Sequence, residues 1–317
     1  MLMFQINKQK FGQLDAIEIS HLTQGIQLQI IHTFGALINK FVVNNSPFSF
    51  ISGYKNFDDL IEQHPFFSRS AKLFPFPNRL DKGQYSYQSV NYQLPANFPW
   101  SDHAVHGLLY NQPFEMISAQ TTDEFATITL RFSTNALHAG YPFAFQIDIT
   151  YLINLNGELS CTTKITNLDQ RPLPFGDACH PYFSLDCPLK DTLLSIPRCQ
   201  KLVLVDDLPS GESHPFNDFE APRSLANTTL NDCFEFDHHD PVKLLFKRVD
   251  HSAKLTFIQK TGYRFLQLYT PPSEPSLAIE PMTCPSNAFN NYIGLRFLNS
   301  GESANFTWQC QPEYTPL

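Results

Sequence analysis

Apolar and polar residues alternate with a period of two along much of the chain, which is typical of strands with one buried face. In the clearest example every odd position from Phe143 to Leu155 is apolar, and most even positions between them are polar. Asn156-Gly157 follows at once, and this dipeptide suits the tight turns that join antiparallel strands. Because alternation resumes after the turn, residues 143–166 are predicted to form a long β-hairpin.

The same pattern predicts strands over the rest of the chain. They are residues 15–20, 26–32, 36–43, 126–133, 201–205, 242–247, 254–259, 264–270, 276–280, 292–298 and 303–310. One short helix is predicted from Tyr54 to Gln63, and Pro65 is expected to stop it. Most of the 24 prolines fall in the connections, where a missing N–H does not interrupt a sheet.

These elements predict an all-β fold. No linker, low-complexity segment or repeat of fixed period divides the 317 residues, which disfavours a propeller or a solenoid. Large all-β units often reach this length as one domain. We therefore expect residues 1–317 to form a single large antiparallel β-sandwich with long connections at one end.

Composition narrows the classes of partner. With 42% hydrophobic, 14% aromatic and 16% charged residues, the chain is globular and has a sizeable core. A net charge of −8 and the lack of any basic run argue against nucleic-acid binding. No segment is long enough to span a bilayer, and the N-terminus has no signal-peptide core, so no membrane partner is expected. The seven cysteines form no Cys-x-x-Cys pair and are odd in number, which favours a cytoplasmic protein without disulfides.

One imidazole and one carboxylate lie in segments that would hold them at strand ends. His180 follows a bend rich in Pro, Gly and Asp, and Pro181 biases its backbone toward an extended conformation. Glu280 follows a short apolar run and precedes Pro281. An imidazole titrates near neutral pH and burial tunes a carboxyl pKa upward, so together they suit acid–base catalysis. Taken singly, His180 is equally well interpreted as a structural histidine in a turn, and Glu280 as a strand residue that faces the surface.

Three further residues are candidates for binding a substrate. Arg79 lies between apolar residues, where its guanidinium suits two sugar hydroxyls or a phosphate, or else an ordinary salt bridge. His106 precedes Gly107 in a polar, irregular stretch, which favours a hydrogen-bonding role over loop packing. His103 is three residues away, but no third and fourth metal ligands follow at suitable spacing, so no metal is expected. Asp232 suits either two neighbouring hydroxyls or a turn.

In their order along the chain, these five positions resemble the aldose 1-epimerase (galactose mutarotase-like) family. The matching motifs are Asn78-Arg79-Leu80, His106-Gly107, His180-Pro-Tyr-Phe183, Asn231-Asp232, Glu280-Pro-Met-Thr283 and Asn287-Ala-Phe-Asn290. The resemblance covers nearly the whole chain. It implies a large antiparallel β-sandwich, called a galactose mutarotase-like supersandwich, with a sugar bound in an open cleft on one sheet. It also implies interconversion of the α and β anomers of an aldose, without a cofactor or a metal.

The resemblance implies a role for each residue. Glu280 would remove the proton from the C1 hydroxyl while His180 protonates the ring oxygen, so that the ring opens and recloses on the other face. Arg79, His106 and Asp232 would hold the hydroxyls.

The segment around His180 resembles the branch that includes glucose-6-phosphate 1-epimerases, so the expected partner is a small sugar, either an aldohexose or a hexose phosphate. Binding a sugar phosphate would require a basic pocket with further cationic side chains in addition to Arg79. The other candidates are Lys72, Lys82, Arg131 and Arg198.

Two other functions stay open. A glycoside-processing enzyme would use Asp232 and Glu280 as paired carboxylates, but His180 would then have no task. A non-catalytic carbohydrate-binding protein would use the same cleft without turnover, since fold resemblance does not establish an activity. The chain is expected to be a monomer or a homodimer.

Overall fold

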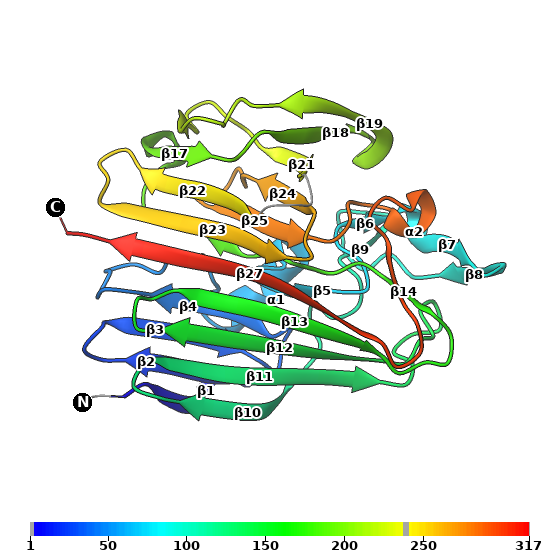
Figure 1. The fold of residues 1–317 in the computed structure, drawn as a ribbon, viewed down its shortest axis with the longest axis horizontal. Helices are drawn as coiled ribbons and strands as arrows, with labels where there is room; N and C mark the ends of the chain where they lie inside the picture. The colour runs from blue at the N-terminus through cyan, green and yellow to red at the C-terminus, as the bar shows by residue number, and fades with distance from the viewer. Residues whose placement is uncertain (1–2, 237–240, 317) are drawn as a thin grey trace.

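The structure, a computed structural model, describes residues 3–236 and 241–316, and most of its regular elements are antiparallel strands (Figure 1). The largest sheet has nine strands. In spatial order they are β10 (Glu115–Thr121), β11 (Phe125–Thr134), β12 (Phe145–Asn154), β13 (Leu159–Asn167), β27 (Ser303–Tyr314), β23 (Ala253–Thr261), β22 (Val242–Arg248), β17 (Thr192–Ser195) and β20 (Arg223–Ser224). The alternation thus produces an all-β antiparallel fold, as predicted.

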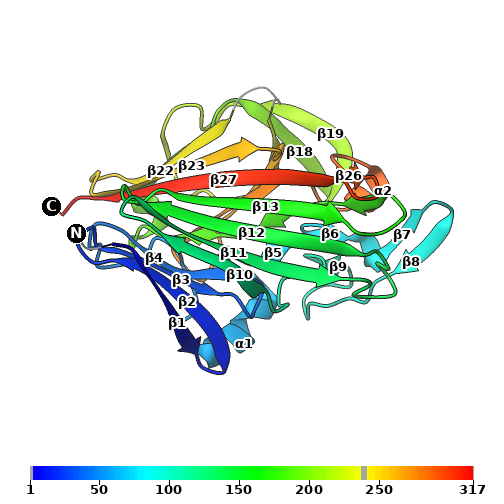
Figure 2. The ribbon, with the colours of Figure 1, turned by 60° about the horizontal axis from the view of Figure 1, so that its bottom comes forward.

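An eight-stranded sheet carries the candidate site. Its strands are β19 (Leu208–Phe216), β18 (Cys199–Val205), β21 (Asn231–Glu235), β24 (Phe265–Tyr269), β25 (Leu277–Met282), β15 (Ala178–Cys179) and β5 (Lys72–Leu73), with β16 (Tyr182–Phe183) also paired to β25. A four-stranded sheet lies at one corner of the molecule in Figure 2. It contains β1 (Gln5–Phe11), β2 (Leu14–His21), β3 (Ile26–Ile31) and β4 (Leu37–Val42).

The remaining elements are short. Three two-stranded sheets pair β14 (Leu173–Phe175) with β26 (Arg296–Leu298), β6 (Arg79–Leu80) with β9 (Ala104–Val105), and β7 (Gln84–Tyr87) with β8 (Val90–Gln93). The helices are α1 (Phe57–Phe67) and α2 (Ala288–Asn291), with 3₁₀ turns at Asp81–Gly83 and Leu189–Asp191. Among the described residues, no helix combines the length and the apolar character that crossing a bilayer requires.

The predicted hairpin is the centre of the core. In β12 the odd positions from Phe145 to Ile153 are buried and the even positions are partly exposed, and β12 pairs with β13 across the predicted turn. The buried side chains of the nine-stranded sheet pack in one cluster with those of β24, β25 and the four-stranded sheet. On the same inner side, Trp308 of β27 stacks on Phe257 with ring centroids 5.5 Å apart.

Most predicted strands are confirmed, but two local predictions are wrong. In the segment 292–298, only Arg296–Leu298 is a strand, because α2 and a turn at Tyr292 with φ of 61° come before it. Pro65 does not stop the helix: α1 starts after the N-cap Asn56 and runs to Phe67. Pro65 lies in the last turn, where a missing N–H removes only one helical hydrogen bond.

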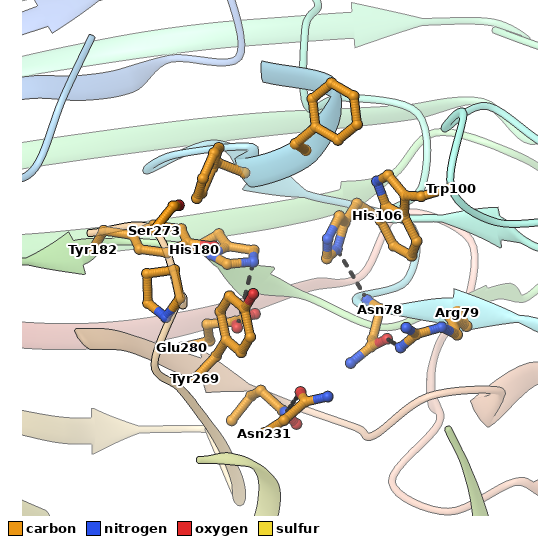
Figure 3. Close-up of a pocket in the computed structure, with 14 residues that line it drawn as sticks. Asn78, Arg79, Trp100, His106, His180, Tyr182, Asn231, Tyr269, Ser273 and Glu280 are labelled. Atoms are coloured by element: carbon orange, nitrogen blue, oxygen red, sulfur yellow. Dashed lines mark hydrogen bonds and ion pairs between the residues drawn. The ribbon is translucent and has the colours of Figure 1, made fainter. Parts of the chain in front are cut away.

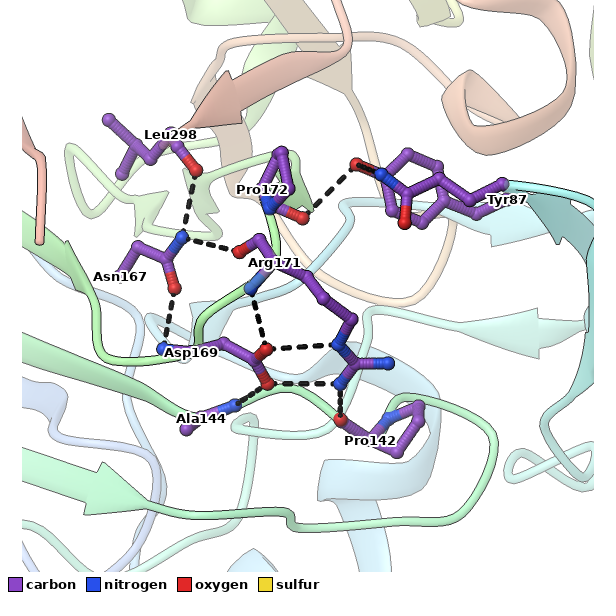
Figure 4. A network of polar contacts seen from close by, with 9 residues as sticks. Tyr87, Pro142, Ala144, Asn167, Asp169, Arg171, Pro172 and Leu298 are labelled. Atoms are coloured by element: carbon purple, nitrogen blue, oxygen red, sulfur yellow. Dashed lines mark hydrogen bonds and ion pairs between the residues drawn. The ribbon is translucent and has the colours of Figure 1, made fainter. Parts of the chain in front are cut away.

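A polar network fixes the path from β13 toward His180 (Figure 4). The Asp169 carboxylate accepts two hydrogen bonds from the Arg171 guanidinium and one from the Ala144 N–H, and the Arg171 hydrogen bonds hold the pKa of Asp169 well below its usual range. The Asn167 side-chain amide donates to the carbonyls of Arg171 and Leu298. The connection between β13 and β14 is therefore tied to its neighbours at both ends.

Candidate active site

An open cleft of about 330 Å³ lies on the eight-stranded sheet (Figure 3). It is lined by Phe66, Phe67, Asn78, Arg79, Trp100, His106, His180, Tyr182, Asn231, Gln267, Tyr269, Pro271, Ser273 and Glu280. Four of the five residues singled out from the sequence are in this set. Strands β21, β24 and β25 supply the floor, while the end of α1 and the segments around β6 and β9 supply the walls.

Strand pairing brings Glu280 into the cleft. β25 is buried along its whole length, and Glu280 lies opposite Gln267 of β24, so the two side chains share one face of the sheet. Glu280 is only 2% exposed. Burying a carboxyl group this deeply costs free energy unless the group has a partner. The position of Glu280 therefore indicates a functional role.

His180 faces Glu280 directly. Its Nε2 lies 3.4 Å from Glu280 Oε1. Two backbone hydrogen bonds hold its main chain: the His180 N–H donates to the Ala71 carbonyl, and the Ser70 N–H donates to the His180 carbonyl. The imidazole also stacks on the Tyr182 ring, with centroids 4.9 Å apart and planes nearly parallel. The ring is therefore held in position before any substrate arrives.

Burial shifts the two groups in opposite directions. It lowers the pKa of His180 to about 3, and it raises the pKa of Glu280 well above the usual carboxyl range. Both shifts favour the uncharged form of each group over a carboxylate and an imidazolium. Glu280 Oε2 and His180 Nδ1 are buried without a hydrogen-bond partner among the described residues. A ligand rich in hydroxyl groups would satisfy such atoms.

His106 and Asn78 support each other beside this pair. The His106 N–H donates to the Asn78 carbonyl, and the Asn78 N–H donates to His106 Nδ1 at 3.2 Å. Since Nδ1 accepts a hydrogen bond, His106 Nε2 carries the hydrogen and is a donor. Burial lowers the pKa of His106 well below its usual value, so the ring is neutral. Gly107 follows with φ of 69°, and a Cβ there would lie 2.2 Å from the Phe74 carbonyl oxygen.

Arg79 lies on the other side of the cleft, and both interpretations from the sequence apply to it. It lines the cleft, and its Nη2 also lies 3.0 Å from Asp207 Oδ2. Nη1 donates to Asn78 Oδ1, and the guanidinium lies over the Trp100 ring at 5.3 Å from its centroid. Arg79 is therefore restrained by three neighbours.

Asp232 does not line the cleft. β21 places Asp232 opposite Leu268 and Asn231 opposite Tyr269, so consecutive residues face opposite sides of the sheet. The Asp232 carboxylate lies 2.8 Å from Lys201 Nζ. The neighbouring Asn231 lines the cleft instead, and its Oδ1 accepts a hydrogen bond from the side chain of Gln267.

Sequence reasoning missed several residues of the cleft. Asn78 and Asn231 adjoin predicted site residues, so the motifs located them without assigning them a role. Gln267 had a usable signal, because it lies in a predicted strand next to that of Glu280. Phe66, at the end of α1, had none. Trp100 could be considered for stacking on a sugar, but a tryptophan in a β protein is more often in the core; here its Nε1–H donates to the Pro65 carbonyl across the cleft wall.

Comparisons with known proteins identify the family and the fold of the chain. Residues 15–311 match the family model described as aldose 1-epimerase. The uncharacterised protein YihR of Escherichia coli K12 is 29% identical over 253 residues, which cover 76% of this chain and 78% of that protein.

Two solved structures share the fold. A galactose mutarotase-like protein from Clostridium acetobutylicum superposes with a TM-score of 0.85 at 18% identity, covering 99% of both chains. A galactose 1-epimerase from Lactobacillus acidophilus NCFM superposes with a TM-score of 0.81 at 17% identity, also over 99% of both chains. At these identities the structural likeness establishes the fold alone. Because the family model matches nearly the whole chain, this protein belongs to the aldose 1-epimerase family.

Proposed function

We propose that this protein is a mutarotase that interconverts the α and β anomers of an aldose by acid–base catalysis. The observation that carries the proposal is the buried pair of Glu280 and His180, 3.4 Å apart and facing an open cleft. Anomer exchange needs one proton removed from the C1 hydroxyl and one delivered to the ring oxygen. At this separation one proton can pass between the two side chains, which gives the carboxylate and the imidazolium that the two transfers require.

In the proposed reaction Glu280 acts as the base and His180 as the acid. Glu280 takes the proton of the C1 hydroxyl, the bond between C1 and the ring oxygen breaks, and His180 protonates that oxygen. Rotation about C1–C2 turns the other face of the aldehyde toward the freed hydroxyl. Reclosure reverses both proton transfers and returns the pair to its starting state.

The remaining polar groups are proposed to hold the sugar and its open chain. His106 Nε2–H and the Arg79 guanidinium donate to hydroxyls, and the amides of Asn231 and Gln267 lie on the floor beside Glu280. Asp232 pairs with Lys201 on the other face of the sheet, so the neighbouring Asn231 is proposed to contact the hydroxyls in its place. Pre-positioned donors of this kind keep the open chain in the geometry needed for reclosure.

The two other functions have less support. Of the described residues that line the cleft, Glu280 alone carries a carboxylate, whereas a typical glycosidase needs a second one across the bond to be cleaved. A sugar-binding protein would have no use for a buried pair with opposed pKa shifts. The cytoplasm stays the proposed location, because all seven cysteines are free thiols and six of them are buried.

The test is the approach of freshly dissolved α-glucose and α-galactose to anomeric equilibrium, followed by polarimetry after subtraction of the spontaneous rate. We expect acceleration by the wild type and a loss of roughly 10²–10⁴-fold in kcat for Glu280→Gln. Glu235→Gln is the matched control, since Glu235 lies on β21 and pairs with Arg264 outside the cleft lining. No acceleration by the wild type on either sugar would contradict the proposal for these substrates.

A further inference from the structure

The basic side chains around the cleft already have carboxylate partners. Two ion pairs adjoin it, namely Arg79 with Asp207 at 3.0 Å and Arg69 with Glu274 at 2.7 Å, while Lys201 pairs with Asp232 at 2.8 Å on the other face of β21. Arg69 lies over the ring of Phe67, which lines the cleft, at 4.2 Å from its centroid. The cleft is therefore close to electrically neutral although cations stand at its edges.

Arg79 is the decisive member of this set. Among the described residues that line the cleft, it alone carries a permanent positive charge. Its partner comes from a distant part of the chain, the turn between β18 and β19, where Asp206 and Asp207 have φ of 51° and 63°. The Asp207 side chain is half exposed, so the pair lies at the mouth of the cleft where a substrate substituent would enter.

We propose that Asp207 is a specificity-determining residue that occupies Arg79 and excludes anionic sugars, so that the cleft takes neutral aldoses. The inference rests on the proposed mutarotase function and deepens it. A phosphate binds arginine best through two parallel N–H groups, but Asn78 already takes one N–H of Nη1 and Asp207 lies against Nη2, so a phosphate would share the guanidinium with a carboxylate. A neutral hydroxyl needs only one donor and meets no like charge.

A phosphate that reached Arg79 would also lie close to the Asp207 carboxylate. Two like charges roughly 5 Å apart at a partly exposed site repel enough to change an equilibrium constant by about tenfold or more. Of the other cations named from the sequence, Arg131 pairs with Asp148 at 2.7 Å, Arg198 pairs with Glu220 at 3.4 Å, and Lys82 does not line the cleft. Lys72 is only 1% exposed, with its Nζ 2.5 Å from Asp177, and so does not reach the cleft.

The test compares Asp207→Asn with Asp206→Asn. Asparagine keeps the side-chain size and tolerates the left-handed backbone, so each variant removes one charge from the same turn. The measured quantity is kcat/KM for α-glucose and for α-glucose 6-phosphate. We expect the wild type to prefer glucose and Asp207→Asn to shift the ratio toward the phosphate by about tenfold. Asp206→Asn is expected to leave the ratio unchanged.

A binding measurement separates this inference from the proposed function. Inorganic phosphate is titrated calorimetrically into the wild type, the two variants, and Asp207→Asn combined with Arg79→Gln. We expect saturable phosphate binding at Arg79 in Asp207→Asn that is lost in the combined variant, whether or not any form turns over a sugar. Equal shifts in both single variants, no shift in Asp207→Asn, or a wild type that prefers glucose 6-phosphate would overturn the role of Asp207.

Discussion

His64 should make this protein less stable in mild acid, because its imidazole is buried in the neutral form. It lies on α1 and is 3% exposed. The Arg69 N–H donates to the Tyr54 hydroxyl, which in turn faces His64 Nδ1 at 2.8 Å, while His64 Nε2 faces the Tyr110 carbonyl at 3.0 Å. Since a carbonyl only accepts, Nε2 carries the hydrogen and Nδ1 accepts from Tyr54. Protonation of Nδ1 would break that hydrogen bond.

The size of the effect follows from the two pKa values. Burial lowers the pKa of folded His64 from 6.5 to about 4, and a histidine in the unfolded chain keeps about 6.5. Between these values the unfolded chain binds more protons, so the free energy of unfolding falls as pH falls through this window. At about pH 5 the expected loss from His64 is about 2 kcal/mol, and at about pH 8 it is close to zero.

Urea unfolding at about pH 8 and about pH 5 measures this loss as the difference between two free energies of unfolding. His64→Gln should reduce the difference by about 2 kcal/mol, even if the substitution destabilises the protein at both pH values. Phe34→Leu is the control, because its ring packs edge-on against His64 at 4.8 Å and does not titrate. It should lower stability equally at both pH values. The reasoning is refuted if His64→Gln keeps the full wild-type difference.

Two further predictions concern buried charge. Lys72→Met should lower the free energy of unfolding by about 3–5 kcal/mol, because it leaves the fully buried Asp177 carboxylate without its cation; urea titration measures this, and an unchanged midpoint would contradict it. The free-enzyme kcat/KM should show no acid limb from an ordinary imidazole near pH 6.5, because burial lowers the pKa of His180 to about 3. Initial rates from about pH 5 to pH 8 check this, and a midpoint near 6.5 would argue for an exposed acid.

Much of the fold could be predicted, because a strand with one buried face has alternating apolar and polar residues that are visible in the sequence. The hairpin of β12 and β13 is the clearest case, since each strand has one face in the core and one outside it. β1 and β19 were not predicted. Their residues are largely exposed on both faces, so neither strand has a buried stripe to reveal it.

The candidate site was predictable only in part, for a geometric reason. His180 and Glu280 lie in distinctive motifs, and the structure brings them together. The choice between Asn231 and Asp232 depends on the register of β21 against β24, and a shift of one residue moves every side chain to the other face. Asp207 gave no local signal, because its partner Arg79 lies far away in the sequence.

The position of β27 has a consequence for biosynthesis. This late strand lies inside the nine-stranded sheet, between β13 and β23, as Figure 1 shows. Until residues 303–314 leave the ribosome, β13 and β23 each present an unpaired edge, which is a template for aggregation. Such distant pairings also fold slowly. We therefore expect a chain halted before β27 to depend on chaperones, and late nonsense mutations to produce insoluble protein rather than a partly active enzyme.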